Sequence, residues 1–407
     1  MTHDVVIVGG GPAGLSAARR LAVSGIRDVV VLERESEAGG IPRHCGHTGF
    51  GIGQFLALPM TGPTYARRLV EATHGIEIRT RATVTAIQPG GRVHVTDPET
   101  GPTIVTGRCV LLATGIRETP RSARLVSGAR PWGVTTTGAL QQFVYLKHAK
   151  PFSRIVVVGT ELVSFSALLT ARHAGITVAA MLEEGERITA RRPGDWIARR
   201  VFGVPVLTRT KLVAIRGLDR VEGVELERAG HRETIACDGV VFTGRFQPET
   251  AILRGSSITL DPGTGGPAID QYFRCSDLQI FAAGNLLRPV ETSGLCWAEG
   301  RVVAANMILS LQSKLPEATP AVPVTYAAPL KYVYPQRITG EMGVAGPMPP
   351  LRARVSRAAR GRLRLLVDGR ELWSHRVKLL PERRITIPTD RLPPVGAQAI
   401  HVELIED

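Results

Sequence analysis

The first forty residues alternate apolar runs with glycines and with a helical pattern. Residues 4–8 form a short apolar run, residues 9–14 are rich in glycine, and residues 15–21 have the composition of a helix. A second apolar run, residues 28–32, ends at Glu33. The pattern predicts strand, tight turn, helix and strand, which is typical of an α/β domain with a parallel sheet.

Further along the chain, the same patterns predict three kinds of element. Short alternating segments predict a β-meander of half-exposed strands, apolar runs predict buried strands, and residues 298–311 predict a helix. The meander lies at residues 76–80, 84–87, 93–95 and 104–106, and the buried strands lie at residues 110–115, 154–159 and 278–283.

The last part of the chain has a different pattern. Residues 315–323 contain three prolines and predict a linker. Strand-like runs at residues 363–367 and 371–377 flank Asp368-Gly369, a dipeptide typical of a hairpin turn. Further strand-like runs at residues 384–387 and 400–405 complete a small β-rich segment, which contains no cysteine.

Glycines at the first turn carry the clearest chemistry. Gly9 permits the tight turn, Gly11 lets a pyrophosphate approach the backbone, and Gly14 allows close packing of helix on strand. The helix begins at Pro12 and Ala13, and its N-terminal amides attract phosphate. Glu33, about 20 residues on, is placed to bind a ribose. Together these residues predict a dinucleotide-binding site.

The residues after Glu33 favour FAD over NAD. Glu33 is followed by Arg34 and then by the pair Gly39-Gly40, which lets another loop lie against an extended cofactor. The buried strand at residues 110–115 ends in a turn of small residues, and the strand at residues 278–283 ends at a polar side chain. The expected FAD contacts are Gly9, Gly11, Pro12, Ala13, Gly14, Glu33, Arg34, Gly40, Ile41, Ala113, Thr114, Gly115, Gly284, Asn285 and Gly294.

With these motifs the chain resembles the flavoproteins that have two dinucleotide-binding domains, the pyridine-nucleotide-disulfide-reductase-like superfamily, over about residues 1–310. The resemblance implies an α/β fold with two Rossmann-like three-layer domains and a small C-terminal β-rich domain. The implied domains are residues 1–115 with 240–315 for FAD, 116–239, and 316–407. The late motif of the superfamily ends in Asp, whereas this chain has Asn285, whose neutral amide can still hydrogen-bond the cofactor.

The second glycine motif is incomplete. Gly159 follows its strand, but Glu161 and Ser164 replace the other two glycines. A carboxylate at Glu161 adds bulk and negative charge where a pyrophosphate would lie. The next strand ends in Glu183-Glu184, which could accept a hydrogen bond from an adenosine ribose but would repel a 2′-phosphate. We therefore expect that NADPH binding is lost and NADH binding is impaired.

Composition and cysteine spacing limit the class of protein to which the chain can belong. The 407 residues are 43% hydrophobic and 21% charged, and no apolar run reaches the length of a membrane span. With no leader-like start, we expect a cytoplasmic protein without a transmembrane segment. The five cysteines form no CxxC pair, which argues against a redox-active dithiol of the thioredoxin reductase type.

The net charge of +14 is concentrated near the C-terminus. Residues 352–384 hold eleven Lys or Arg and three carboxylates, a net charge of +8. The arginines alternate with Leu and Val, which predicts the solvent face of strands. A solvated face and a docking surface for an acidic protein both fit this pattern. No aromatic platform accompanies the charge, so we do not expect a nucleic-acid partner.

The loop after Gly40 carries three candidate catalytic residues, His44, Cys45 and His47. The three crowded side chains have no fourth ligand nearby, so a metal site is not expected. A histidine there could accept a proton during flavin reduction by an amine. Alternatively, the histidines could hydrogen-bond loop carbonyls or cofactor oxygens.

Residues 39–51 also resemble one branch of the superfamily, the flavoprotein subunits of opine oxidase, hydrogen cyanide synthase and D-hydroxyproline or proline dehydrogenases. This resemblance implies a flavin electron-transfer subunit whose partners are a small [2Fe–2S] protein and an oxidase-like flavoprotein subunit. The implied substrate is an amine or amino acid, and the acceptor an iron–sulfur or quinone-type centre. Many relatives carry four C-terminal cysteines, but the last cysteine here is Cys296, so an iron–sulfur cluster would have to come from a partner.

Two alternatives to this function are open. One is a free-standing NADH-dependent reductase, which requires that the turn at Gly159 binds NADH in spite of Glu161. The other is a non-catalytic flavin-binding subunit with a role in assembly.

Overall fold

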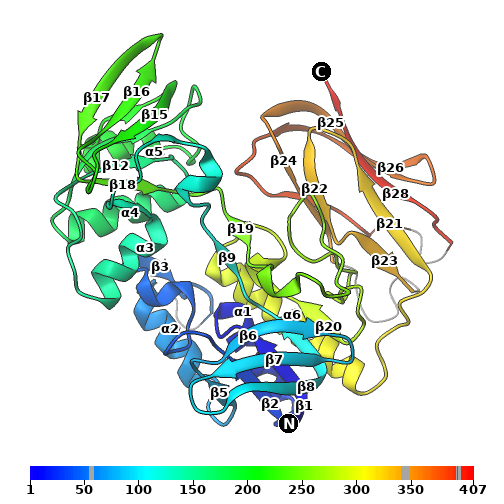
Figure 1. The fold of residues 1–407 in the computed structure, drawn as a ribbon. Helices are drawn as coiled ribbons and strands as arrows, with labels where there is room; N and C mark the ends of the chain where they lie inside the picture. Colours follow the sequence, from blue (N-terminus) through cyan, green and yellow to red (C-terminus); the bar gives the residue numbers. More distant parts are fainter. Residues whose placement is uncertain (55–58, 341–348, 391, 393–395) are drawn as a thin grey trace. The chain divides into compact units, whose positions relative to one another are not determined.

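The computed structural model describes residues 1–54, 59–340, 349–390, 392 and 396–407. These residues form two compact units, which we describe separately (Figure 1). The first unit comprises Met1–Gly40, Ala66–Ile116 and Pro248–Asp407. The second comprises Ile41–Tyr65 and Arg117–Gln247. Helix α2 (Gly62–Glu71) and strands β9 (Ile116–Arg117) and β19 (Gln247–Pro248) contain three of the points where the chain passes from one unit to the other.

A seven-stranded sheet is the centre of the first unit, with the order β5-β2-β1-β8-β7-β6 and with β20 also paired to β8. Strand β8 is long enough to pair antiparallel with β7 along its first half and parallel with β20 at its end. The strands are β1 (Thr2–Val8), β2 (Val29–Leu32), β5 (Glu77–Arg79), β6 (Thr83–Gln88), β7 (Arg92–Asp97), β8 (Gly101–Leu112) and β20 (Ile280–Ala282).

Helices α1 (Pro12–Val23) and α6 (Ser293–Leu311) belong to the same unit and contact each other closely. A Cβ atom on Gly300 would lie 2.2 Å from the carbonyl oxygen of Ala13, so the approach of the two helices requires glycine. The predicted helix over residues 298–311 is confirmed, and it begins five residues earlier than expected, at Ser293.

The second unit has a five-stranded parallel sheet, in the order β11-β18-β12-β13-β14, and a four-stranded sheet, β10-β15-β16-β17. The first comprises β11 (Val134–Thr136), β12 (Arg154–Val158), β13 (Thr177–Leu182), β14 (Val206–Leu207) and β18 (Gly239–Phe242). The second comprises β10 (Ser127–Gly128), β15 (Thr210–Arg216), β16 (Gly223–Arg228) and β17 (His231–Ala236). Further elements of this unit are the antiparallel pair β3 (Thr48–Phe50) and β4 (Met60–Thr61) and helices α3 (Thr137–Gln141), α4 (Leu162–His173) and α5 (Gly194–Trp196).

The C-terminal strands, drawn in yellow to red in Figure 1, form two sheets, β23-β21-β28-β25-β26 and β22-β24-β27. They are β21 (Ala321–Tyr326), β22 (Leu330–Tyr334), β23 (Arg337–Thr339), β24 (Leu351–Val355), β25 (Ala359–Val367), β26 (Arg370–Leu379), β27 (Ile385–Ile387) and β28 (Ile400–Glu406). The predicted Asp-Gly hairpin joins β25 to β26, with φ of 49° at Asp368 and 80° at Gly369. The α/β architecture with a β-rich C-terminal part is thus confirmed.

These strands have a hydrophobic core of their own, although their contacts group them with the first unit. The division of the chain into three domains at residues 115, 240 and 316 is therefore kept as a proposal.

Much of the C-terminal positive charge is neutralised within this part of the chain. Arg357 pairs with Glu406, and Arg360 and Arg376 both pair with Asp407. The acidic residues of β28 and the C-terminus lie outside residues 352–384. Over residues 352–407 the sequence has twelve Lys or Arg and seven carboxylates, a net charge of +5. The alternation of arginines with apolar residues is confirmed, because Leu363 and Leu365 are buried whereas Arg360 and Arg362 are exposed.

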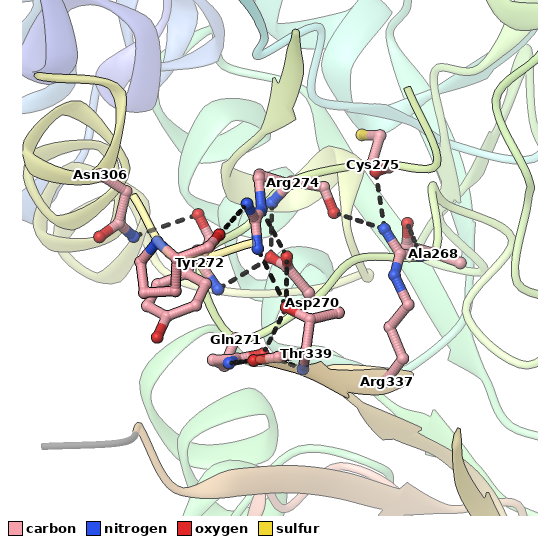
Figure 2. Close-up of polar contacts among 10 residues, drawn as sticks. Ala268, Asp270, Gln271, Tyr272, Arg274, Cys275, Asn306, Arg337 and Thr339 are labelled. Carbon is pink, nitrogen blue, oxygen red and sulfur yellow. Dashed lines mark hydrogen bonds and ion pairs between the residues drawn. The ribbon is translucent and has the colours of Figure 1, made fainter. Parts of the chain in front are cut away.

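A buried polar network joins the C-terminal strands to the segment before β20 (Figure 2). The guanidinium of Arg274 donates to Asp270 at 2.6 Å, and both side chains are at most 5% exposed. Arg274 also donates to the hydroxyl of Thr339 in β23, and Gln271 exchanges hydrogen bonds with the backbone of Thr339. Arg337 donates to the carbonyls of Arg274 and Cys275. Each of these side chains has a partner, so the network fixes β23 at this segment.

We expect Asp270→Ala to lower the free energy of unfolding by about 3–5 kcal/mol, because it leaves Arg274 buried without its carboxylate. Urea unfolding followed by circular dichroism measures this change. Arg376→Ala is the control, since its side chain is 71% exposed and its loss should cost about 1 kcal/mol or less. Equal effects of the two substitutions would contradict the importance of the buried network.

Candidate functional site

The turn between β1 and α1 is built from glycines that allow backbones to approach closely. Gly9 has a φ of 108°, and a Cβ atom there would lie 2.4 Å from the carbonyl oxygen of Ala113. A Cβ atom on Gly14 would lie 2.0 Å from the carbonyl oxygen of Gly9. Both contacts are too short for any side chain, so both positions require glycine.

Gly11 is different, because space is open beside it. The nearest atom to a Cβ placed there is the Cα of Gly40, at 3.9 Å. Among the described residues, no side chain caps the N-terminus of α1, which has Pro12 in its first turn. The amides of this turn are therefore free to bind an anion. Gly40, with a φ of 63°, keeps the opposite wall free of a side chain. This cradle fits the pyrophosphate of a dinucleotide.

Glu33 lies directly after β2 and is 7% exposed. Its Oε2 accepts from the amide of Gly10 at 2.9 Å, and its Oε1 accepts from the amide of Glu35 at 2.9 Å. These bonds fix the carboxylate beside the glycine turn, and each oxygen retains a lone pair for a ribose hydroxyl. Arg34 points outward, with a side chain 61% exposed and 3.7 Å from Glu35.

The other expected cofactor segments lie next to this turn. The amide of Ala113 donates to the carbonyl of Val8, and the hydroxyl of Thr114 donates to the carbonyl of Glu249. The carbonyl of Gly115, a residue with a φ of 75°, accepts from the amide of Glu249. A Cβ atom on Gly284 would lie 3.0 Å from the Cβ of Ala13.

Asn285 hydrogen-bonds this chain's own backbone. Its Oδ1 accepts from the amide of Glu291 at 2.6 Å, and its Nδ2 donates to the carbonyl of Glu291 at 3.1 Å. One N–H of the amide is left for another acceptor. Gly294 lies in the first turn of α6, which also has no side-chain cap. Within the first unit, Glu33, Ala113 and Gly284 thus lie next to the β1–α1 turn, Arg34 points outward, and Ile41 belongs to the second unit.

Burial changes the chemistry of His44 and Cys45 in the second unit. Burial, followed by the charge of Arg43, lowers the pKa of His44 to about 4, so its imidazole is neutral at pH 7. Burial raises the pKa of the Cys45 thiol to about 12, and its Sγ donates to Gln141 Oε1 at 3.6 Å. His47 is held by the carbonyl of Thr48 and by the hydroxyl of Ser166 in α4. A catalytic role for the three residues remains a proposal, and the raised pKa of Cys45 disfavours a thiolate there.

Sequence motifs alone did not indicate Glu118 and Gln141. Glu118 follows β9 and accepts from the amide of Gly138 at 2.7 Å, and burial raises its pKa. Gln141 is 2% exposed and accepts from Cys45. Gln141 is 96 residues from Cys45 in sequence. Neither Gln141 nor Glu118 belongs to a motif, so no local pattern indicated these two residues.

The second glycine turn contains a carboxylate instead of open space. Glu161 is the residue before α4, and its Oε2 accepts from the hydroxyl of Thr243 at 2.7 Å. A Cβ atom on Gly159 would lie 2.6 Å from Glu161 Oε2, and one on Gly244 would lie 2.3 Å from Glu161 Oε1. The carboxylate therefore lies between the two glycines, and burial raises its pKa.

Glu183, after β13, also has partners within the chain. Its Oε2 accepts from the hydroxyls of Thr160 and Thr189, and its Oε1 accepts from the amide of Gly185. The acid expected to face an adenosine ribose is thus hydrogen-bonded to its own loop.

Comparison with known proteins identifies relatives over most of the chain. Residues 3–304 match the family described as pyridine nucleotide-disulphide oxidoreductase. Thioredoxin reductase of Treponema pallidum is 28% identical over 331 residues, which cover 76% of this chain and 99% of the relative. An opine oxidase subunit of Rhizobium meliloti is 24% identical, covering 77% of this chain and 72% of the relative. Hydrogen cyanide synthase subunit HcnB of Pseudomonas protegens is 30% identical, covering 45% and 39%.

Solved structures show the same fold. Thioredoxin reductase of T. acidophilum superimposes with a TM-score of 0.64 at 22% identity, covering 76% of this chain and 98% of that one. L-proline dehydrogenase of P. horikoshii superimposes with a TM-score of 0.60 at 19% identity, covering 77% and 56%. In the described part of the chain, every helix is too short or too polar to cross a membrane.

Two glycine substitutions should separate cofactor binding from folding. We expect Gly14→Ala to lower the free energy of unfolding by about 3 kcal/mol, because its Cβ would clash with the backbone. Gly11→Ala should change it by about 1 kcal/mol or less, since space is open there, and should weaken FAD binding about tenfold or more by narrowing the pyrophosphate cradle. Urea unfolding of the apoprotein and fluorescence titration with FAD measure the two effects. Unchanged FAD affinity in Gly11→Ala would contradict the cradle.

The buried cysteines should be unreactive in the folded protein. All five are free and buried. With a pKa of about 12, Cys45 stays a protonated thiol at pH 8. We expect no reaction with Ellman's reagent within minutes in the native state and reaction of five thiols after denaturation. A single fast-reacting thiol that is lost in Cys45→Ser would show that Cys45 is not a buried, protonated thiol.

Proposed function

Because the chain belongs to the family of pyridine nucleotide-disulphide oxidoreductases, which bind FAD, we propose that it is the flavin electron-transfer subunit of a heteromeric amine or amino-acid dehydrogenase. Membership of this family makes the chain an FAD-dependent oxidoreductase.

One observation carries the proposal: the contrast between the two glycine turns. The turn at Gly11 is open and suited to a pyrophosphate, whereas the turn at Gly159 is filled by the carboxylate of Glu161. A nucleotide phosphate there would have to displace Glu161 from Thr243 and overcome charge repulsion. We therefore propose that NAD(P)H is not the electron donor.

The cysteines support a protein partner. A flavin that receives no hydride from a nucleotide, and has no neighbouring dithiol, needs another redox centre on each side. All five cysteines are buried, free and without a CxxC spacing. Oxidation of an amine to an imine releases two electrons and two protons. In the proposed complex an oxidase-like subunit carries out this step, and the present chain relays the electrons to a small [2Fe–2S] protein or a quinone-type acceptor.

The names of two relatives support a role as a subunit of a larger complex. Two matched proteins are named as subunits, of opine oxidase and of hydrogen cyanide synthase. Within this chain, bound FAD would be held by the β1–α1 turn, with Glu33 at the ribose and Asn285 near the ribityl chain. FAD supplies the ability to accept and release electrons.

A second candidate is an NADH-dependent reductase. Relatives named nitric oxide reductase FlRd-NAD(+) reductase match 43% of the chain at 24% identity. This function requires that Glu161 moves or becomes protonated, and its raised pKa makes protonation easier than for an exposed carboxyl group. A non-catalytic flavin-binding subunit is the third candidate, in which no donor reduces the flavin.

Anaerobic stopped-flow absorbance at 450 nm tests the proposal. We expect NADH to reduce the wild-type flavin slowly or not at all, and amines or amino acids to reduce it only when partner subunits from the native source are present. Rapid reduction by NADH would overturn the proposal in favour of the reductase, and no reduction by any donor with partners present would favour the assembly role.

Substitution of Glu161 tests whether this residue is the reason that NADH does not reduce the flavin. We expect Glu161→Gly to increase the rate of flavin reduction by NADH about tenfold or more, because it removes bulk and charge from the turn. Glu186→Gly is the control, since Glu186 is an exposed carboxylate of the same unit that pairs with Arg209. If NADH reduces Glu161→Gly no faster than the control, Glu161 is not what excludes the nucleotide.

A further inference from the structure

The loop that follows β20 carries Asn285, the residue that the proposed function places at the flavin. The orientation of its side chain is set by two hydrogen bonds to the backbone of Glu291, at 2.6 and 3.1 Å. The position of Glu291 therefore decides where the remaining N–H of Asn285 points.

Two arginines from the C-terminal strands hold Glu291. Arg384, directly before β27, binds both carboxylate oxygens, with Nε–Oε1 at 3.1 Å and Nη2–Oε2 at 2.6 Å. Arg354, in β24, donates from Nη2 to the carbonyl of Val290 at 2.8 Å and lies 3.8 Å from Glu291 Oε1. The side chain of Glu291 is 3% exposed, so water contributes little to holding it. A bidentate guanidinium fixes both the position and the plane of the carboxylate.

A second set of contacts fixes the start of the same loop. The amide of Gly284 donates to Glu299 Oε2 at 2.7 Å, and Arg288 donates to both oxygens of Glu299, at 2.8 and 3.1 Å. The guanidinium of Arg288 lies 4.2 Å from the ring centre of Tyr334 in β22. Strands β22 and β24 and the residue directly before β27 thus contact one loop of eight residues, Gly284 to Glu291.

These contacts form a largely buried cluster of ion pairs. Three guanidinium groups, of Arg288, Arg354 and Arg384, surround two carboxylates, of Glu291 and Glu299, and the side chains of this cluster are at most 30% exposed. Such a cluster keeps its geometry only when each charge is paired, since an unpaired buried charge is costly. It also leaves one excess positive charge beside the loop.

We propose that the C-terminal strands act as a positioning element of the flavin site, and that Arg384, supported by Arg354, acts through Glu291 to orient Asn285 toward the cofactor. This inference rests on the role of Asn285 in the proposed function. It gives the C-terminal strands a task within the cofactor site, in addition to any contact with partner proteins.

A double-mutant cycle on FAD binding tests the inference. The variants are Arg384→Ala, Asn285→Ala and the combination, each prepared as apoprotein and titrated with FAD. Arg383→Ala is the matched control, because Arg383 is adjacent and exposed. Visible circular dichroism and the midpoint potential of the bound flavin are measured for each variant, and far-UV circular dichroism confirms the fold.

We expect Arg384→Ala to weaken FAD binding about tenfold or more and to lower the midpoint potential, because it releases Glu291 and removes a positive charge. Arg384→Lys, which keeps the charge, should restore part of the affinity, and Arg383→Ala should match wild type. In the combined variant the loss should be smaller than the product of the two single losses, because both act at one contact.

Fully independent effects in the combined variant would overturn the inference, as would wild-type affinity, dichroism and potential in Arg384→Ala. If Arg384→Ala does not fold, Glu291→Gln replaces it, since this variant keeps the backbone bonds to Asn285 and loses the charge that Arg384 binds. Wild-type behaviour of Glu291→Gln would then overturn the inference. Wild-type affinity of Asn285→Ala would instead contradict the role that the proposed function gives to Asn285.

Discussion

The close approach of backbones at the β1–α1 turn is the constraint on which the first unit depends. Gly9 lets the carbonyl of Ala113 come within reach, Gly14 lets α1 fold back on the turn, and Gly300 lets α6 pack on Ala13. Side chains at these positions would separate β1, β8 and the two helices. Because the backbones meet, the amides at the start of α1 and the carboxylate of Glu33 converge on one open space beside Gly11.

The two Rossmann-like units show how one residue changes the chemistry of a shared geometry. Both have a strand, a glycine with positive φ and a helix without a side-chain cap. In the first unit the space at the turn is open, and in the second the Glu161 carboxylate occupies it and is bonded to Thr243. The fold of the second unit does not need a nucleotide, since its core is formed by the apolar residues of its own sheet and helices.

The arginines of the C-terminal part of the chain form two kinds of ion pair. On the sheet that contains β25, exposed arginines pair with Glu406 of β28 and with Asp407 at the C-terminus. On the other sheet, Arg354 and Arg384 reach a buried carboxylate of the segment after β20. The exposed ion pairs contribute little to stability, whereas the buried ion pairs constrain a loop of the candidate flavin site. The net charge of the segment does not distinguish these two kinds of ion pair.

The sequence by itself determined features that depend on near neighbours: strands β1, β2, β12 and β20, helices α1 and α6, the glycine turn at Gly9, and the hairpin at Asp368-Gly369. Each is set by backbone conformation or periodicity within a few residues. The tertiary structure decided which side chains meet. Glu291 and Arg384 are 93 residues apart, and Cys45 and Gln141 are 96 apart. Such pairs have no local signature, because burial and ion pairing arise only when the folded core brings distant strands together.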